Sequence, residues 1–189
     1  IEFDFCIQLR DKFGNLQVSA GEESLLRCQI WEIHDKNLTH HSSIQSFNNG
    51  TYKVVMEPRL AGDHLLSCFY NEKHLLGSPW PLKVVSGNAY PKWSWAEGTG
   101  YQNATVNYEA MFYIYLRDME ANMRHEKDKV WVEATGAGGT LNEPLPITVT
   151  YIGGGIYNAT YIPKVSGSYT LQVFIKGMKL NTTSTVTVY

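Results

Sequence analysis

The stretch GTYKVVMEP, residues 50–58, occurs a second time in altered form as GIYNATYIP, residues 155–163. Both copies have a Gly, a Tyr two positions later and a Pro at the same spacing, and each Pro is followed four residues on by another Gly. Between the Gly and the Pro, apolar residues alternate with other residues, which is the periodicity of a β-strand. The chain therefore contains the same strand-forming segment twice, 105 residues apart.

The duplication extends well beyond this segment. FCIQLRD at residues 5–11 matches FYIYLRD at residues 112–118, and in both the apolar residues alternate along one face. A repeat of this length is too long for a solenoid and suits two whole domains in tandem. We predict a first domain at residues 1–87 and a second at residues 88–189, with SGNAYP at residues 86–91 as a short linker between them.

The strand signals indicate an all-β fold, namely two tandem immunoglobulin-like antiparallel β-sandwiches. Helical periodicity is hard to find anywhere in the chain. The first domain has only residues 1–4 before its FCIQLRD, whereas residues 92–111 precede FYIYLRD in the second, so we expect the first strand of the first domain to be missing from this fragment or supplied from elsewhere. Strands are predicted at 3–10, 25–33, 42–47, 51–57, 63–70 and 80–86, and then at 92–96, 111–117, 129–135, 146–152, 156–162, 168–176 and 179–188.

Charge and hydropathy exclude several classes of partner. The chain has 16 Lys and Arg against 18 Asp and Glu, and no basic patch in either half, so we expect no nucleic-acid partner. The longest apolar candidate, AMFYIYL at residues 110–116, is too short for a membrane-spanning helix. We interpret the sequence as an excised fragment and expect membrane attachment only through an anchor outside it.

Two longer segments carry a family resemblance. NGTYKVVMEPRLAGDH at residues 49–64 and NEKHLLGSPWPLKV at residues 71–84 resemble the filamin-type immunoglobulin repeat. The second copy keeps Arg117-Asp118, Gly155, Pro163 and Gly167 but lacks the Gly-Ser-Pro. The resemblance implies two tandem filamin-type sandwiches.

Five Asn-x-Ser/Thr triplets favour a secreted protein, because this triplet is the acceptor for N-glycosylation. One such triplet carries little weight, but five in solvent-facing positions point to the secretory pathway. The predicted acceptors are Asn37, Asn49, Asn103, Asn158 and Asn181.

A filamin-type sandwich with such acceptors is similar to the ectodomains of plant gamete-expressed sperm-surface adhesion proteins. The resemblance implies an adhesion module on the extracellular face of the plasma membrane, attaching gametes during fertilisation through a protein on the opposing cell. The alternative is an intracellular filamin-like scaffold that crosslinks actin or binds peptides by strand addition along Leu25–Ile33 or Lys129–Thr135.

The cysteines leave two alternatives open. Cys28 and Cys68 both face the predicted core on strands that we expect to be neighbours, so they form a disulfide if directly opposite, or else remain free buried thiols. Cys6 is expected to face outward. The spacing of Cys and His does not suit zinc, and His34, His40 and His41 are interpreted as solvated loop residues. No catalytic motif is present, so we expect no enzyme activity, cofactor or metal.

Two tryptophans stand beside the predicted linker. Trp93 and Trp95 are predicted to lie on one face of the first strand of the second domain. They either pack in the core or between the domains, or they form an exposed anchor for a partner, since Trp is enriched at binding hot spots.

Overall fold

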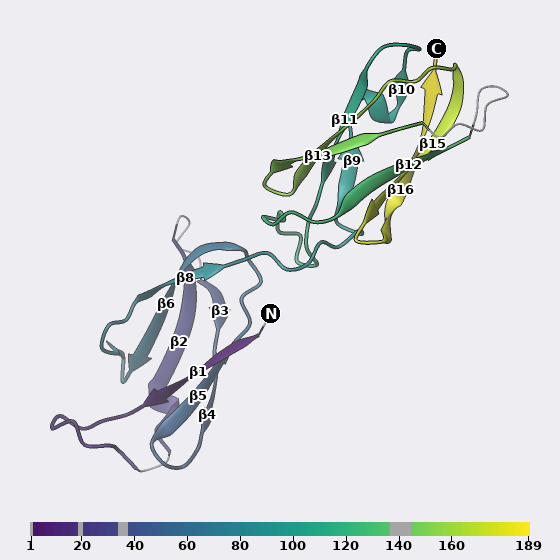
Figure 1. Ribbon diagram of the computed structural model, residues 1–189. Coiled ribbons are helices and arrows are strands. Elements are labelled where there is room, and N and C mark those ends of the chain that lie inside the picture. Colours follow the sequence, from purple (N-terminus) through teal and green to yellow (C-terminus); the bar gives the residue numbers. More distant parts are fainter. Residues whose placement is uncertain (1, 19–20, 34–37, 137–144) are drawn as a thin grey trace. The chain divides into compact units, whose positions relative to one another are not determined.

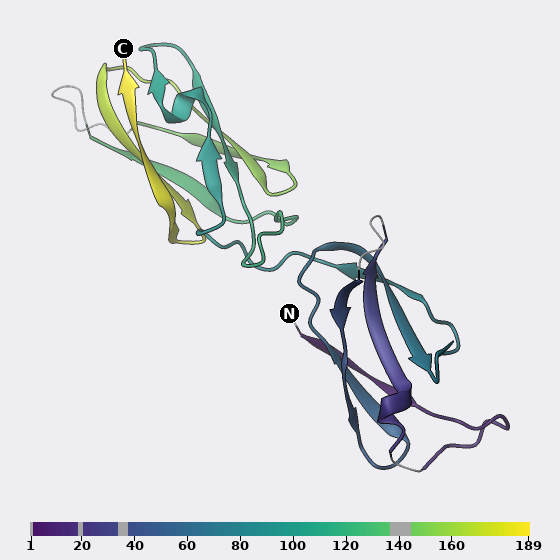
Figure 2. The same ribbon diagram turned by 180° about the vertical axis from the view of Figure 1, so that it is seen from behind.

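The computed structural model describes residues 2–18, 21–33, 38–136 and 145–189. The chain divides into two compact units, Ile1–Val85 and Ser86–Tyr189. In the described ranges the chain forms strands, turns and two short 3₁₀ turns but no α-helix. Each unit is a sandwich of two sheets whose strands pair antiparallel with one short exception (Figures 1 and 2). The predicted all-β fold of two immunoglobulin-like sandwiches is confirmed.

Unit 1 contains a three-stranded and a five-stranded sheet. In the first sheet β5 lies between β1 and β4; in the second, β2 pairs with β3 and β6, and β6 also pairs with β7 and β8. The elements are β1 (Phe3–Gln8), η1 (Glu23–Leu25), β2 (Leu26–Glu32), β3 (Leu38–His41), β4 (Ser43–Ser46), β5 (Thr51–Met56), β6 (Gly62–Tyr70), β7 (Lys73–His74) and β8 (Trp80–Val84).

Unit 2 contains two four-stranded sheets, ordered β13-β14-β11-β9 and β10-β16-β15-β12. All pairs are antiparallel except β10 with β16. The elements are β9 (Trp95–Glu97), η2 (Thr99–Tyr101), β10 (Asn103–Ala104), β11 (Ala110–Tyr115), β12 (Val130–Thr135), β13 (Thr148–Gly153), β14 (Ile156–Tyr161), β15 (Gly167–Ile175) and β16 (Met178–Val188).

The repeated segment that opens the sequence forms the equivalent strand of both units. β5 buries Tyr52, Val54 and Met56, and β14 buries Tyr157 and its alternate neighbours, while the residues between them are partly exposed. Fully burying a side chain of this size contributes about 1.5–3 kcal/mol. The alternating apolar residues of the repeated segment therefore pack each strand against the core of its unit.

The glycine that precedes each of these strands is required by two constraints. Gly50 and Gly155 have φ angles of +76° and +77°, in the left-handed region that favours glycine. A Cβ atom would also lie 1.6 Å from the Gln17 carbonyl oxygen at Gly50 and 2.3 Å from the Arg124 carbonyl oxygen at Gly155. The positive φ angle and the close backbone approach together explain why a glycine recurs at this position.

An aspartate closes the turn after β1 and its counterpart in unit 2. The Asp11 carboxylate accepts hydrogen bonds from the backbone N–H groups of Phe13 and Asn15, and its pKa is lowered mainly by the side-chain amide of Asn15. Asp118 accepts the equivalent bonds and one more, from the backbone N–H of Gly87 at 2.8 Å. Both aspartates therefore hold the turn after their strand by accepting hydrogen bonds from its backbone N–H groups.

The segment predicted as a linker is built into unit 2 instead. Ser86, Ala89 and Pro91 are buried, and Tyr90 N–H donates to the carbonyl of Arg117. Residues 86–91, which were predicted as a short linker between the domains, are therefore part of unit 2. The polar composition of this segment satisfies buried partners in unit 2, and the structural boundary falls two residues before the predicted one.

A buried charge network holds this segment. Arg124 donates to the carbonyls of Ser86 and Gly87, and its Nε lies 2.8 Å from Asp128 Oδ2. Lys176 Nζ is 2.7 Å from the other oxygen of Asp128. Burial alone raises the pKa of Asp128, but the hydrogen bonds and charges of Arg124 and Lys176 outweigh it and lower that pKa below its ordinary value.

Four strand assignments differ from the predictions. The first strand of the second domain, predicted at 92–96, is the shorter β9, because the turn at residues 91–93 precedes it. β3, β7 and β10 were not predicted, since all three are short and lack apolar alternation. In unit 1, β1 starts at Phe3 and is the counterpart of β11, so residues 2–4 form no separate first strand.

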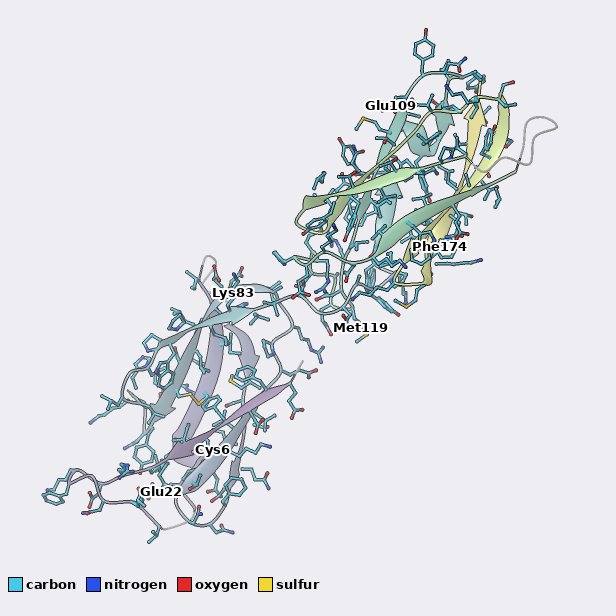
Figure 3. All side chains as sticks on the ribbon, in the orientation of Figure 1. Cys6, Glu22, Lys83, Glu109, Met119 and Phe174 are labelled. Atoms are coloured by element: carbon cyan, nitrogen blue, oxygen red, sulfur yellow. A yellow bond between two sulfur atoms is a disulfide. The ribbon has the colours of Figure 1, made fainter. Side chains whose placement is uncertain are left out.

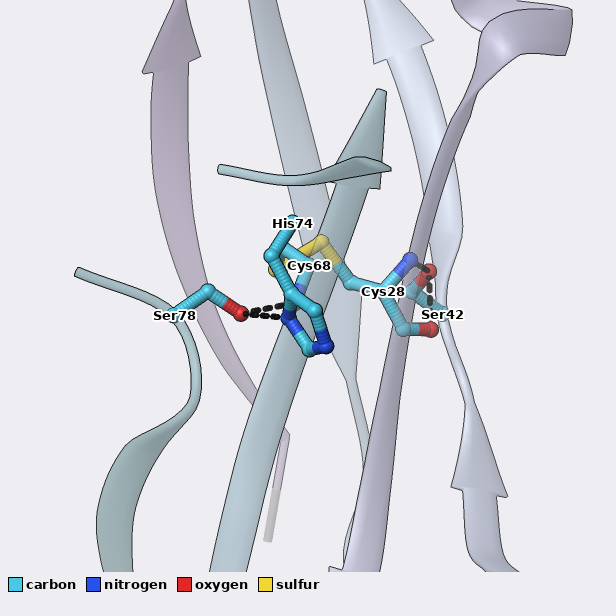
Figure 4. Close-up of a disulfide and its surroundings, with 5 residues drawn as sticks. All are labelled: Cys28, Ser42, Cys68, His74 and Ser78. Atoms are coloured by element: carbon cyan, nitrogen blue, oxygen red, sulfur yellow. Dashed lines mark hydrogen bonds between the residues drawn. A yellow bond between two sulfur atoms is a disulfide. The ribbon is translucent and has the colours of Figure 1, made fainter. Parts of the chain in front are cut away.

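A disulfide joins Cys28 of β2 to Cys68 of β6 (Figure 4). The two residues are directly opposite in the antiparallel pair, which was the condition stated for a bridge. Ser78 Oγ accepts from the backbone N–H of Cys68 and lies 3.0 Å from His74 Nδ1, while Ser42 Oγ donates to the carbonyl of Cys28. Cys6 is exposed and free, as expected.

We predict that replacing the disulfide by Cys28→Val and Cys68→Val destabilises unit 1 alone. Unit 2 has Val132 and Val173 at the same cross-strand register, so the replacement keeps an apolar pair and removes only the covalent link. Loss of a crosslink spanning 40 residues is expected to cost about 4 kcal/mol. Hydrogen exchange resolved by peptide should show lower protection across β2 and β6 and unchanged protection in unit 2. Cys6→Ser is the control, and equal loss of protection in both units would contradict the prediction.

We also predict that unit 2 loses stability in acid through Asp128. Because its pKa is lower in the folded than in the unfolded state, the stabilisation is fully present above about pH 4 and is lost as the pH falls through the folded pKa. Asp128→Asn is expected to cost about 3 kcal/mol at pH 7, since it leaves Arg124 buried without its partner, and to flatten the pH dependence of unfolding.

Denaturant unfolding between pH 2 and 7, followed by hydrogen exchange in unit 2, measures both effects. Glu126→Gln is the matched control, because Glu126 also contacts Arg124 but its side chain is 72% exposed. A shift for Glu126→Gln as large as that for Asp128→Asn would refute the assignment.

Candidate partner-binding surface

Aromatic side chains line the outer face of the β13-β14-β11-β9 sheet. Trp95 of β9 stacks on Tyr115 of β11 with ring centroids 4.7 Å apart and planes 9° apart. Tyr113 lies next along the strand, 6.4 Å from Tyr115. We call these three residues, together with Arg117, the aromatic stripe. All four are partly exposed, which is informative because outward positions of a strand are usually polar.

Charged groups complete the stripe. The Arg117 guanidinium lies 5.0 Å from the Trp95 ring centroid, in cation–π geometry, and its Nη1 donates to the carbonyl of Ala121. The Arg117 Nε is buried with no hydrogen-bond partner among the described residues. Loss of solvation and the neighbouring Glu97 carboxylate raise the pKa of Tyr115, whose hydroxyl hydrogen-bonds to Glu97. The face therefore offers flat aromatic rings, neutral phenols and one cation, a composition typical of binding hot spots.

The corresponding face of unit 1 has none of these aromatic residues. Tyr113 is paired with Asn158 in the same register in which Cys6 is paired with Lys53, so Cys6 occupies the position of Tyr113 and Gln8 that of Tyr115. Only the arginine recurs, as Arg10. The two units share one fold, so folding does not require aromatic residues at these positions.

A second aromatic pair, on the opposite sheet, has a counterpart in unit 1 in which an arginine replaces one of the two rings. Trp131 stacks on Phe174 with centroids 5.1 Å apart (Phe174 is labelled in Figure 3). At the same register of unit 1, Arg27 lies 4.9 Å from the ring of Phe69. We attribute this pair to the architecture that both units share. Trp131 therefore serves below as the control position on the opposite sheet.

The two tryptophans singled out from the sequence do not share a strand. Trp95 begins β9 and belongs to the aromatic stripe, whereas Trp93 lies in the turn before it and is 48% exposed. The placement on one strand face is therefore wrong, and a role for either residue in partner binding remains a proposal. Sequence reasoning passed over Tyr113 and Tyr115, although inward alternation of Phe112, Ile114 and Leu116 already required both to face outward.

The predicted glycan acceptors fall into three groups. Asn49, Asn103 and Asn181 are exposed, and the last two lie on the sheet opposite the aromatic stripe. Asn158 faces outward on β14 as predicted, but it lies opposite Tyr113, and its Oδ1 is buried with no partner among the described residues. Asn37 lies outside the described residues.

The two sheet edges that were predicted to bind peptides by strand addition differ in whether another strand already pairs with them. In unit 1, β3 pairs with β2 over Gln29–Trp31, so that edge is already occupied. In unit 2, β12 pairs with β15, and its other edge has no strand partner within the described ranges. The edge predicted at Leu25–Ile33 is thus wrong, and that at Lys129–Thr135 remains.

The described ranges contain neither a candidate membrane-spanning helix nor a candidate metal site. None of the helical segments there is long and apolar enough to cross a membrane. No group of three or more His, Cys, Asp or Glu side chains in those ranges is placed to hold a metal ion. The histidine cluster lies at residues 34, 40 and 41, whose side chains are outside this description.

The sequence matches the family model of the Filamin/ABP280 repeat twice, at residues 2–81 and 88–183. The chain therefore belongs to the filamin repeat family, and the prediction of two tandem repeats is confirmed. Filamin-A of Drosophila melanogaster is 33% identical over 86 residues, which cover 43% of this chain and 4% of that protein. The chain thus spans only a small part of this relative.

Solved structures share the fold at low sequence identity. The adhesin FdeC of Escherichia coli has a TM-score of 0.67 at 16% identity, over 100% of this chain and 59% of that one. InvD of Yersinia pseudotuberculosis has a TM-score of 0.59 at 14% identity, over 99% of this chain and 52% of that one. At these identities the likeness establishes the two-domain immunoglobulin-like fold.

We predict that the Asn-x-Ser/Thr triplets (sequons) differ in how often they carry a glycan when the protein is secreted from eukaryotic cells. Glycopeptide mapping should find glycans at the exposed Asn49, Asn103 and Asn181, and lower occupancy at Asn158, which has the least space. Thr51→Ala, Thr105→Ala and Thr183→Ala remove the three exposed sequons one at a time and serve as controls. Full occupancy of Asn158 would contradict the prediction and would cover the aromatic stripe.

Proposed function

We propose that this chain is an extracellular cell-adhesion module that binds a protein on an opposing cell. The observation that carries the proposal is the aromatic stripe, which unit 2 has and unit 1, with the same fold, lacks. Partly exposed Trp, Tyr and Arg side chains held in fixed stacks lose little conformational entropy on binding and bury a large area.

The positions of the exposed glycan acceptors support the proposal that the aromatic stripe is the binding surface. Glycans at Asn103 and Asn181 would cover the β10-β16-β15-β12 sheet, and the low occupancy that we predict for Asn158 would leave the opposite sheet largely bare. The Cys28–Cys68 disulfide suits an oxidising compartment, where such bonds persist. Both features support an extracellular location, and we propose that an anchor outside this sequence holds the chain at the plasma membrane.

The specific setting we propose is attachment between gametes during fertilisation. It rests on the combination of tandem filamin-type repeats with several glycan acceptors, which resembles plant sperm-surface proteins. The partner is a protein on the other gamete.

The second candidate is a filamin-like intracellular scaffold that binds peptides by strand addition or crosslinks actin. One observation favours it: the outer edge of β12 has no strand partner within the described ranges and presents backbone donors and acceptors. In this case the asparagines of protein from its native source would be unmodified, and binding would depend on β12 and not on the aromatic stripe.

The proposal is tested by counting how many beads coated with this chain adhere to the opposing gametes. Beads carrying the chain should bind, and the variant Tyr113→Ser/Tyr115→Ser should reduce the number of bound beads about tenfold, the equivalent of about 1.4 kcal/mol. Trp131→Ser is the matched control, because it removes an aromatic ring from the opposite sheet of the same unit. Protease treatment of the cells should abolish binding, since the proposed partner is a protein.

Two results would count against the proposal. Equal binding by the double variant, with its fold intact by circular dichroism, would remove the aromatic stripe from adhesion. Loss of binding with Trp131→Ser alone would assign contact to the other sheet.

A further inference from the structure

The outward residues along β11 and its two flanks are arranged symmetrically about Tyr113. Because successive side chains of a strand point to opposite faces, every second residue belongs to this row. The row consists of Glu109, Met111, Tyr113, Tyr115 and Arg117. Figure 3 labels Glu109 at one end of unit 2 and Met119, two residues beyond Arg117, at the other. The row therefore has an acid at one end, a base at the other and apolar or aromatic side chains between them.

The middle of this sheet face is uncharged across its other two long strands. The outward residues of β13 and β14 are Thr148, Thr150, Ile152, Ile156, Asn158 and Thr160. Outward positions of a sheet that meets water are usually polar and often charged. A depletion of charge at the centre of a surface is instead typical of the core of a protein–protein interface.

The corresponding face of unit 1 is charged in its middle. Asp4 has the position of Met111, and Lys53 has that of Asn158, because the two strand pairs share one register. The Nζ atom of Lys53 lies 3.1 Å from Oδ2 of Asp4, so the two charges form an ion pair on the outer face. The fold therefore accepts charges at these positions, and unit 2 has none there.

The charges at the two ends of the row have no ionic partner within the described ranges. None of the ion pairs there includes Glu109 or Arg117. Nη1 of Arg117 donates to the carbonyl of Ala121, and its Nε is buried with no hydrogen-bond partner among the described residues. The same end charges recur in unit 1 as Glu2 and Arg10, so they belong to the repeat. Only in unit 2 do they flank an uncharged face.

A two-fold axis over Tyr113 brings every residue of the row against a complementary one. Sheets that pack face to face lie about 10 Å apart, and a row of this length extends over about 27 Å. An axis that lies between the two faces and runs across the strands sets the second β11 antiparallel over the first. Glu109 of each copy then faces Arg117 of the other, and Met111 faces Tyr115. An axis parallel to the strands would instead set the two Arg117 side chains against each other.

We propose that the partner of the aromatic stripe is a second copy of this chain, bound face to face through the β13-β14-β11-β9 sheets in this two-fold arrangement. The inference rests on the function proposed above, because it uses the same surface and names its partner. The Tyr113 rings meet at the axis, and sulfur–aromatic contacts of Met111 with Tyr115 lie on either side. The contacts between Glu109 and Arg117 occur twice by symmetry and set the orientation of the two copies.

One acidic residue opposes this arrangement and gives it a signature. Glu97 of β9 is opposite Tyr113, so the axis brings it towards its own copy at the edge of the sheet. Both side chains are exposed there, and salt screens their repulsion. Glu97→Gln should therefore strengthen self-association, and the gain should shrink at high salt.

Sedimentation equilibrium of the 189-residue chain, produced without glycans, tests the end charges. The chain should form a concentration-dependent dimer. Glu109→Arg and Arg117→Glu should each raise the Kd about tenfold, because like charges then meet at both ends of the row. An equimolar mixture of the two variants should form a heterodimer about as tightly as the unchanged chain. Glu133→Arg is the matched control, because it makes the same change of charge on the opposite sheet.

Thiol crosslinking tests the axis itself, also where Arg117→Glu loses its fold by circular dichroism. In the Cys6→Ser background, a short bismaleimide joins two introduced thiols by adding one to each of its double bonds. Tyr113→Cys should crosslink to its own copy. Met111→Cys and Tyr115→Cys should crosslink to each other in a mixture and far less when each is alone. Thr170→Cys, on the opposite sheet, is the control.

Bead assays separate this inference from the proposed adhesion. Beads coated with the chain should aggregate with one another, and Glu109→Arg beads should aggregate with Arg117→Glu beads but not with their own kind. A chain that stays monomeric, while its beads still bind gametes, overturns the inference and leaves the proposed function standing. A dimer that neither Glu109→Arg weakens nor Tyr113→Cys crosslinks overturns it as well. Dimerisation with this pattern, but without adhesion to gametes, supports the inference and counts only against the proposed function.

Discussion

The register between β11 and β14 decides which side chains of unit 2 form its core and which reach its surface. Pairing of Phe112 with Ala159 and of Ile114 with Tyr157 buries all four, so the residues between them must face outward. A slip of one residue would exchange the two sets. The glycine at the start of β14 fixes this register, because only a residue without a Cβ fits against the Arg124 carbonyl. The aromatic stripe is thus a consequence of the same constraint that builds the core.

Tandem repeats let the fold be separated from the function. Positions that agree in both units, such as Gly50 and Gly155 or Asp11 and Asp118, serve the shared architecture. Positions that differ are free of that requirement, and Cys6 and Gln8 of unit 1 are replaced by Tyr113 and Tyr115 in unit 2. The Trp131 and Phe174 pair is a useful contrast, because its place in unit 1 is filled by Arg27 over the ring of Phe69.

The fold could be predicted from local sequence patterns. Contacts between residues that are far apart in the sequence could not. Alternation and the repeated Gly-x-Tyr predicted the sandwiches, and the inward faces of Cys28 and Cys68 made their bridge a candidate. The burial of SGNAYP could not be predicted, because the segment has the composition of a turn and its burial depends on Arg124, almost 40 residues away. Trp93 was placed on a strand because alternation cannot locate the end of a turn. Tyr113 and Tyr115 could have been found, since the inward set was already assigned.

One segment of unit 2, residues 95–104, connects the closure of its sheets with its aromatic outer face. These residues cover one edge of each sheet, and the first of them, Trp95, contributes the ring that stacks on Tyr115. The ring of Trp95 takes this place because β9 pairs with β11 and brings Trp95 directly opposite Tyr115. The edge strand that completes this sheet of unit 2 therefore also completes its aromatic outer face, whereas the corresponding outer positions of β1 in unit 1 are Cys6 and Gln8.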